Sequence, residues 1–375
     1  MSAAFWARIV EQLRRGDGAV VATVMRTRGS TPRSVGSRMA VLPGSAIVGT
    51  VGGGCGEARV IECAQQVLQG RPARVVEIDL TGDPDQDEAP ICGGRMEVLI
   101  EPWQPADLVD AERIAAAEAR REEVAVVTVA TSRAQGWSPG QRTLCLAGSE
   151  HECARRLGLS GKAAVVLGQT LARREYRVYA VGSDGMITAE RSTGGAEPIA
   201  AELFFAPCLA APVLAIVGAG HIAQALCEIT FAAGFAVTVL DDRAAFANPE
   251  RFPRAERVVA DDYPGVLGLL PRGRNAFVVI ATRGHQYDEV ALRHVLGRAE
   301  MPQYVGMVAS RRRAKTTRAR LEAHGIDRAR LAAVHMPVGC DIGAETPAEI
   351  AIAIAAEMIT ELRRGQPRPP GERGQ

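Results

Sequence analysis

Residues 213–243, VLAIVGAGHIAQALCEITFAAGFAVTVLDDR, constrain the fold of this chain more than any other segment. Their pattern predicts a strand, a glycine turn, a helix and a second strand. Gly218 and Gly220 allow a tight turn and the close approach of a phosphate group, and Ala223 takes the third small position. Asp241 follows at the distance where an acid that binds a ribose is expected. Together these features predict a Rossmann-like, doubly wound parallel sheet.

The glycine turn does not identify its ligand, because the same backbone donors can receive any phosphate-bearing group. His221 stands in the turn, either as a contact to such a group or as a solvent-facing residue. Further on, the strand FVVIAT ends just before Arg283 and Asp288. Ligands of open α/β sheets gather at such strand ends. The motif therefore predicts a ligand site and leaves its occupant open.

A chain of 375 residues is too long for one ordinary core and predicts more than one domain. We expect an N-terminal α+β domain over residues 1–206, the Rossmann-like domain over 207–364 and a disordered tail over 365–375. The segment AELFFAPCLAAP, with its two prolines, is interpreted as a linker. The expected N-terminal elements are helices at 3–15, 57–68 and 106–122 and strands at 19–27, 38–42, 46–51, 74–80, 124–131 and 142–147.

The charge balance excludes a general affinity for nucleic acid or membrane. The chain has 44 basic and 43 acidic side chains, so its formal net charge is +1 and it creates no large electrostatic field. The basic run Arg311, Arg312, Arg313 and Lys315 lacks interleaved aromatics and is interpreted as a solvated helix face. No apolar run reaches the roughly 18 to 20 residues of a membrane span. The first residues lack the features of a secretory signal, so we expect a cytoplasmic protein.

The eight cysteines contain no CxxC pair, so structural zinc is not expected and the thiols should stay reduced. Symmetric association is the default for soluble proteins, and we expect a homodimer on that ground alone.

A second unusual stretch, residues 28–57, reads RGSTPRSVGSRMAVLPGSAIVGTVGGGCGE. Gly52, Gly53 and Gly54 give a backbone that can approach a ligand closely, and they deliver Cys55 to the start of a predicted helix. A helix N-terminus favours anionic groups and would lower the pKa of a nearby thiol. This loop is either a site that handles a cofactor or an ordinary glycine-rich turn between two strands.

Cys92 is the second thiol that the pattern singles out, because it precedes two glycines in ICGGRMEVLIEPW. It could serve the same site as Cys55. It could equally be a small residue tolerated where two backbones meet.

Taken in order, the motifs of both halves resemble the XdhC/CoxI family of xanthine dehydrogenase accessory proteins. They are GSTPR, GTVGGGCGE, CGGRMEVLIEP, VGAGHIAQAL, DDR, ATRGH, YVGMVAS and VGCDIGAETPAEIAIAIAAEMI. The resemblance implies a chaperone that binds the molybdenum cofactor in its molybdopterin form, protects it, supports its sulfuration and delivers it to a molybdenum hydroxylase apoenzyme. The implied further partners are a cysteine desulfurase and the proteins of molybdenum cofactor biosynthesis.

Carried over residue by residue, the resemblance makes Cys55 and Cys92 the candidate contacts to molybdenum or its sulfur. It also places Gly52, Gly53 and Gly54 at the cofactor. In the Rossmann motif it places Gly218, Gly220, His221 and Asp241 there as well. Two positions depart from the family pattern, since Gly56 and Cys340 stand where apolar residues are expected.

Two other functions fit the same residues. An NAD(P)-dependent oxidoreductase would use the Rossmann motif with Asp241 on the ribose. The sequence shows no obvious Tyr/Lys catalytic pair for it, since its only lysines are Lys162 and Lys315. A persulfide-transfer enzyme would use Cys55 as the sulfur carrier.

Overall fold

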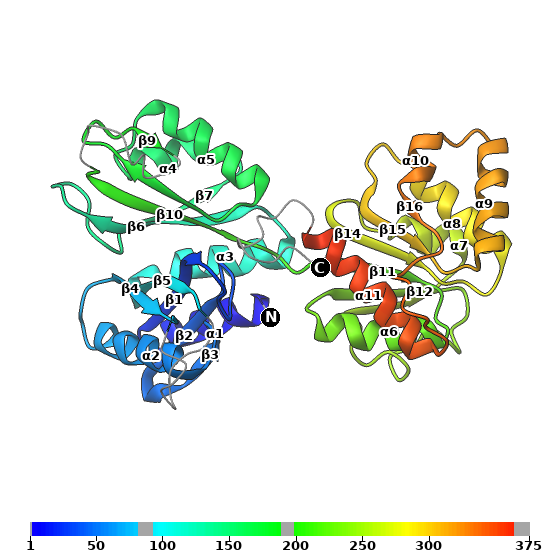
Figure 1. The fold of residues 1–375 in the computed structure, drawn as a ribbon, viewed down its shortest axis with the longest axis horizontal. Coiled ribbons are helices and arrows are strands. Elements are labelled where there is room, and N and C mark those ends of the chain that lie inside the picture. Colours follow the sequence, from blue (N-terminus) through cyan, green and yellow to red (C-terminus); the bar gives the residue numbers. More distant parts are fainter. Residues whose placement is uncertain (1, 82–92, 189–198, 364–375) are drawn as a thin grey trace. The chain divides into compact units, whose positions relative to one another are not determined.

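The computed structural model describes residues 2–81, 93–188 and 199–363. The chain divides into two compact units, and the division falls between Ala210 and Ala211 (Figure 1). None of the helices described is long and apolar enough to cross a membrane.

The first unit contains two antiparallel five-stranded sheets. In spatial order, the first sheet consists of β3 (Ile47–Gly49), β2 (Arg38–Val41), β1 (Ala19–Arg28), β5 (Arg95–Trp103) and β4 (Arg74–Asp79). The second sheet consists of β7 (Arg142–Leu146), β6 (Val124–Ser132), β10 (Ala201–Cys208), β8 (Arg177–Val181) and β9 (Ile187–Thr188).

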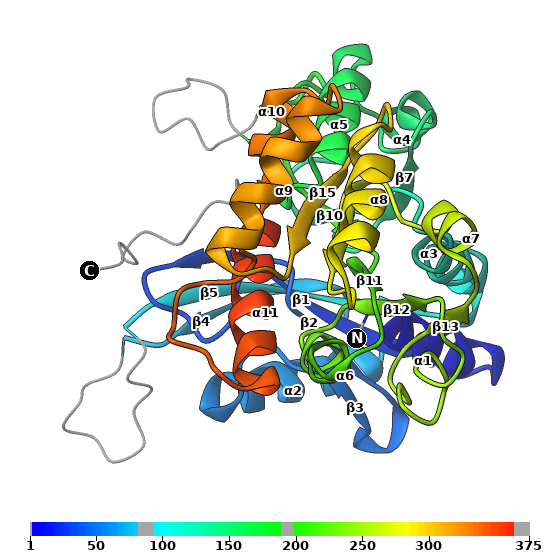
Figure 2. The same cartoon turned by 90° about the vertical axis from the view of Figure 1, so that its right-hand side faces the viewer.

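These two sheets pack face to face, and helices cover their outer faces (Figures 1 and 2). On β1, Val20 and Ala22 point toward α2 (Gly54–Leu68), whereas Val21 points to the opposite face. Burial on both faces explains why β1 is a continuous apolar run instead of an alternating one. The second sheet carries α4 (Glu150–Arg156) and α5 (Gly161–Arg173). The remaining helical elements of the unit are α1 (Ser2–Arg14), α3 (Leu108–Arg120), η1 (Pro43–Ser45) and η2 (Pro105–Asp107).

The interpretation of AELFFAPCLAAP as a linker is wrong for its first eight residues. Ala201–Cys208 form β10, which pairs with both β6 and β8 and is buried along its whole length. Pro207 indicated a linker because proline is uncommon inside a central strand. Burial between the first sheet and α5 also removes the polar–apolar alternation that would have marked a strand.

The second unit is a parallel six-stranded sheet with the order β13-β12-β11-β14-β15-β16. This is the Rossmann strand order, and the predicted fold class is confirmed. Its strands are β11 (Val213–Val217), β12 (Ala236–Asp241), β13 (Arg257–Ala260), β14 (Gly273–Ile280), β15 (Pro302–Met307) and β16 (Val334–His335).

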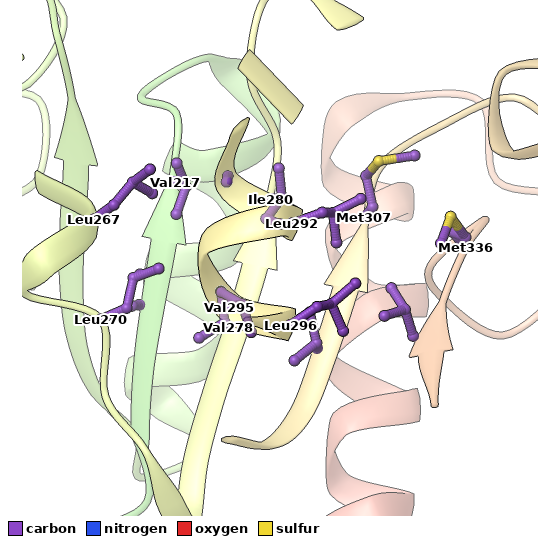
Figure 3. Packing of buried hydrophobic residues seen from close by; sticks show 14 of the residues in the cluster. Val217, Leu267, Leu270, Val278, Ile280, Leu292, Val295, Leu296, Met307 and Met336 are labelled. Carbon is purple, nitrogen blue, oxygen red and sulfur yellow. The ribbon is translucent and has the colours of Figure 1, made fainter. Parts of the chain in front are cut away.

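Helices cover both faces of this parallel sheet. One face is packed by α6 (His221–Ala232) and α11 (Pro347–Arg363). The other is packed by α7 (Tyr263–Gly268), α8 (His285–Leu296), α9 (Arg311–Ala323) and α10 (Arg328–Ala332). Figure 3 shows the core of that second face, where Leu292 and Leu296 lie near Ile280 and Val278 of β14, and Leu267 lies near Val217 of β11.

At the start of α11, Thr346 and Glu349 form the predicted capping box, since each side chain accepts a hydrogen bond from the backbone N–H of the other. The basic run lies in the first turns of α9, where Arg311 pairs with Asp341 and Arg313 with Asp288. The predicted tail at 365–375 falls outside the described residues.

Candidate functional site

Three glycine-containing motifs that are distant in the sequence meet at one end of the first sheet. A Cβ atom added to Gly52 would lie 2.6 Å from Pro32 Cγ, so the GGGC loop touches the GSTPR turn. A Cβ added to Gly94 would lie 2.2 Å from the carbonyl oxygen of Ser30, and one added to Gly29 would lie 2.9 Å from the carbonyl oxygen of Gly93. Close backbone contact therefore requires glycine at these positions.

The triple glycine turns sharply into α2. Gly52, Gly53 and Gly54 have φ values of 146°, 80° and 65°, a region that side chains disfavour. Helix α2 begins at Gly54, three residues before the predicted start at 57. Cys55 is thus the second residue of the helix, and it is exposed.

Glu57 lies in the first turn of α2, and its side chain binds the backbone N–H groups of the loop that precedes the helix. Its Oε2 accepts hydrogen bonds from the backbone N–H groups of Val51 at 3.0 Å and Gly53 at 3.1 Å, and from the Thr50 hydroxyl. Partial burial acts to raise the pKa of Glu57, but these hydrogen bonds outweigh it and the pKa is lowered. The N–H of Gly53, one of the three glycines that we expected to serve a ligand, therefore serves this carboxylate.

Cys55 lies at the junction of two open hollows beside α2, which share Cys55 and Arg59. The Arg95 hollow, of about 490 Å³, is lined by Cys55, Gly56, Arg59, Glu77, Ile78, Asp79 and Arg95. The Arg74 hollow, of about 500 Å³, is lined by Cys55, Ala58, Arg59, Glu62, Cys63, Gln66 and Arg74. Both are large enough to receive part of a cofactor.

Gly56 is buried on the sheet side of α2. A Cβ there would lie 2.9 Å from Ile78 Cγ2 and 3.5 Å from Leu80 Cδ2. These apolar side chains of β4 and the residue after it fill the space that a larger residue would need. The departure of Gly56 from the family pattern therefore has a packing reason.

The structure places only one of the two predicted metal contacts. Cys55 is placed and exposed, whereas Cys92 lies outside the described residues and its role stays a prediction. Within the described ranges, no group of three or more His, Cys, Asp or Glu residues is arranged to hold a bare metal ion.

In the second unit, the two glycines of the turn after β11 have different roles. Gly218 has a φ of 109°, and a Cβ there would lie 2.3 Å from the carbonyl oxygen of Ala281 at the end of β14. Gly220 precedes α6 with a φ of −77°, and a Cβ there would meet no atom within 4 Å. Gly218 is thus required by packing, whereas Gly220 leaves open space at the start of α6.

Asp241 is a buried anchor of this turn. Its side chain is 1 % exposed, and its Oδ2 accepts from the N–H of Ala219 at 2.7 Å. Arg243 donates to both carboxylate oxygens, with Nε–Oδ1 and Nη2–Oδ2 distances of 2.8 and 3.0 Å. Burial acts to raise the pKa of Asp241, but the hydrogen bonds from Arg243 and Ala219 lower it below its ordinary value. A ribose could bind here only after Arg243 moves.

The neighbouring acid, Asp242, accepts a hydrogen bond from Arg283 at 2.7 Å, and the same guanidinium reaches the Tyr287 hydroxyl at 2.9 Å. His221, the first residue of α6, is exposed. The sequence singled out Arg283 at the end of a strand but did not show that it pairs with Asp242, and it did not indicate that Arg243 pairs with Asp241. The sequence shows that Arg243 follows Asp241 by two residues, but it does not show in which direction the arginine side chain points.

The fold and site together define a class of protein: a thiol-bearing glycine loop on a two-sheet unit, joined to a Rossmann unit. Residues 12–79 match the family model of the XdhC and CoxI family, and residues 214–358 match that of the XdhC Rossmann domain. Together these matches cover more than half of the chain. The chain belongs to the XdhC and CoxI family.

Individual relatives agree with this placement. The uncharacterized protein YqeB of Escherichia coli K12 is 35% identical over 150 residues, which are 40% of this chain and 27% of that protein. A probable xanthine dehydrogenase subunit of Bacillus subtilis 168 is 29% identical over 153 residues, which are 41% of this chain and 44% of that protein. The matches thus span less than half of the length of either relative.

One solved structure matches almost the whole fold. The crystal structure of a xanthine dehydrogenase from Bacillus halodurans has a TM-score of 0.72, covering 99% of this chain and 98% of that chain. The sequence identity is 23%, so this likeness establishes the fold.

Proposed function

We propose that this chain is an accessory protein for the maturation of a xanthine dehydrogenase-type molybdenum hydroxylase. It holds the molybdenum cofactor in its molybdopterin form, shields it, supports exchange of an oxo ligand for sulfide, and releases it to the apoenzyme. The cofactor biosynthesis proteins would supply the cargo, and a cysteine desulfurase would supply the sulfur.

The observation that carries the proposal is the exposed thiol of Cys55 at the meeting point of three glycine motifs. A thiolate is a soft ligand and suits molybdenum. A protein thiol can bind directly to a metal whose other ligands come from an organic cofactor. The name of the Bacillus subtilis relative, which contains xanthine dehydrogenase, supports the choice of client enzyme.

The direct test replaces Cys55 by Ser and measures retention of molybdopterin after anaerobic purification. We expect cofactor binding to fall at least about tenfold with no change in the thermal midpoint, because the residue is exposed and packs into no core. Cys340→Ser is the matched control, since Cys340 is also exposed but lies in the second unit. Cys92→Ser tests the second predicted thiol in the same assay.

Unchanged cofactor retention in the Cys55→Ser protein would contradict the proposal. A persulfide trapped on Cys55 after incubation with a cysteine desulfurase, without any cofactor binding, would favour the sulfur-transfer enzyme instead.

The NAD(P)-dependent oxidoreductase is tested through Asp241. Because Arg243 engages both of its carboxylate oxygens, binding of a ribose diol must first break a charged hydrogen-bond pair. We therefore expect weak binding of NAD(H) by the wild-type chain and no turnover. Tight NAD(H) binding with turnover would support the oxidoreductase and count against the chaperone.

A further inference from the structure

The Arg74 hollow is lined by two guanidinium groups, those of Arg59 and Arg74, which have no part in the proposed binding of the metal to Cys55. Among the residues that the structure describes, no carboxylate lies within ion-pair distance of Arg59 or Arg74. Glu62 supplies the one acidic side chain of the lining, so the lining carries one net positive charge. A guanidinium group that is not paired with a carboxylate is available to bind an anionic ligand.

The neighbouring hollow provides the contrast. There, Arg95 pairs with Asp79 at 3.0 Å and lies 3.7 Å from Glu77. Two arginines and two acids line that space, so its charge is balanced. Arg59 lines both hollows, so the two linings together hold three arginines and three acids. The Arg74 side differs in that its arginines form no ion pair among the described residues, whereas Arg95 pairs with Asp79.

Arg74 is held in place without losing its charge. Its Nη2 lies 2.8 Å from Cys63 Sγ, and its Nη1 lies 3.4 Å from Gln66 Oε1. Cys63 is only 5 % exposed, so it gives the guanidinium a fixed support at the edge of the core. A guanidinium oriented in this way can offer its remaining N–H groups to a phosphate.

The hollow follows one face of α2. Cys55, Arg59, Cys63 and Gln66 recur at the spacing that places side chains on the same side of a helix. At 1.5 Å per residue, Cys63 lies about 12 Å along the helix from Cys55. One metal ion cannot contact both thiols, whereas an elongated ligand can reach from Cys55 along α2 toward Arg74.

We propose that the Arg74 hollow is a phosphate subsite, in which Arg59 and Arg74 bind the phosphate group of the ligand whose metal end lies at Cys55. The identity of that ligand rests on the proposed function. The affinity of the hollow for phosphate does not.

The test measures binding of inorganic phosphate by ³¹P NMR titration of the full chain without cofactor. We expect Arg59→Gln and Arg74→Gln each to raise the dissociation constant at least about tenfold, because each removes a charged hydrogen bond to the anion. Glu62→Gln should lower it. Arg71→Gln is the matched control, since Arg71 is an exposed arginine close to Arg74 that lines neither hollow.

Because Arg74 also supports Cys63, its loss could disturb α2. Arg74→Lys keeps the charge, and we expect it to retain most of the phosphate affinity with an unchanged thermal midpoint. Phosphate affinity that is equal in wild type, Arg59→Gln, Arg74→Gln and Arg71→Gln proteins would overturn the subsite.

The same variants separate this inference from the proposed function. If Cys55→Ser abolishes molybdopterin retention while Arg59→Gln and Arg74→Gln leave it unchanged, the hollow does not hold the phosphate of that cofactor and the chaperone stands. If the arginine variants lose phosphate binding while Cys55→Ser retains molybdopterin, the subsite stands and the role of Cys55 is wrong.

Discussion

At the scale of single residues, Glu57 decides how the glycine loop ends. Its carboxylate gathers the loop donors of Val51, Gly53 and Thr50 and so fixes the start of the helix that presents Cys55 to solvent. The thiol is therefore presented by a helix start that is already capped, and the groups beside it that could bind an anion are the side chains of Arg59 and Arg74.

We predict that Glu57→Gln lowers the free energy of unfolding by about 1 kcal/mol at neutral pH, since it removes the charge that the loop donors stabilise. The pKa of Glu57 is lowered in the folded state, so its contribution is present above the ordinary value of 4.5 and is lost as the pH falls through the lowered pKa. Denaturant titrations should show the difference between wild type and variant shrinking as the pH falls below 4.5 and through the lowered pKa of Glu57. A difference of constant size across this range would refute the role of the charge.

Gly56 is the second residue whose identity is set by its neighbours. We predict that Gly56→Leu destabilises the protein by about 1 to 3 kcal/mol, because its side chain overlaps Ile78. Ala58→Leu on the exposed side of the same turn should have little effect. Combining Gly56→Leu with Ile78→Ala should recover part of the loss, and thermal unfolding of the four proteins measures it. Additive effects of the two substitutions would exclude the proposed overlap.

At the scale of elements, the turn between β11 and α6 combines a packing glycine with an open one. Asp241 at the end of β12 ties the turn to its neighbour through Ala219. The carboxyl ends of β11, β12 and β14 are thus held together by contacts within the protein. The open space at this turn lies at Gly220.

We predict that alanine lowers the stability strongly at Gly218 and hardly at all at Gly220. Gly218→Ala should destabilise the second unit by about 3 kcal/mol or more, because the added Cβ collides with the carbonyl of Ala281 and the φ is positive. Gly220→Ala should leave the thermal midpoint within about 2 °C of wild type. If the turn binds a phosphate-bearing ligand, Gly220→Ala should still weaken that binding. Equal stability losses at both glycines would contradict this division.

At the scale of the whole molecule, each unit has hydrophobic cores of its own. The clusters around β1, β6 and α2 contain residues of the first unit, and those around β11 and β14 contain residues of the second. Two units with separate cores can unfold in separate steps.

We therefore predict two transitions in calorimetry, of which Gly218→Ala lowers only one. Core substitution Ile100→Ala, in the first unit, should lower only the other, by an amount equivalent to about 2 to 5 kcal/mol. A single transition that both substitutions shift equally would show that the units unfold together.

The sequence alone determined the Rossmann unit, because its strand–turn–helix–strand pattern, its glycines and its acid all lie within one short segment and depend on local geometry. It also indicated Cys55 at a strand-to-helix junction and the capping box of Thr346 and Glu349. In the first unit it missed β10, because a strand buried on both faces and containing Pro207 lacks the alternation by which strands are recognised.

Only the tertiary structure decided which partner each site residue has. Pro32 lies so close to residue 52 that only glycine fits there. Arg243 donates hydrogen bonds to Asp241, and Arg74 donates one to Cys63. Contacts between segments that are distant in the chain leave no periodic signal, and the direction of an arginine side chain depends on what surrounds it. For that reason the thiol could be picked out from the sequence, whereas the Arg74 hollow beside it could not.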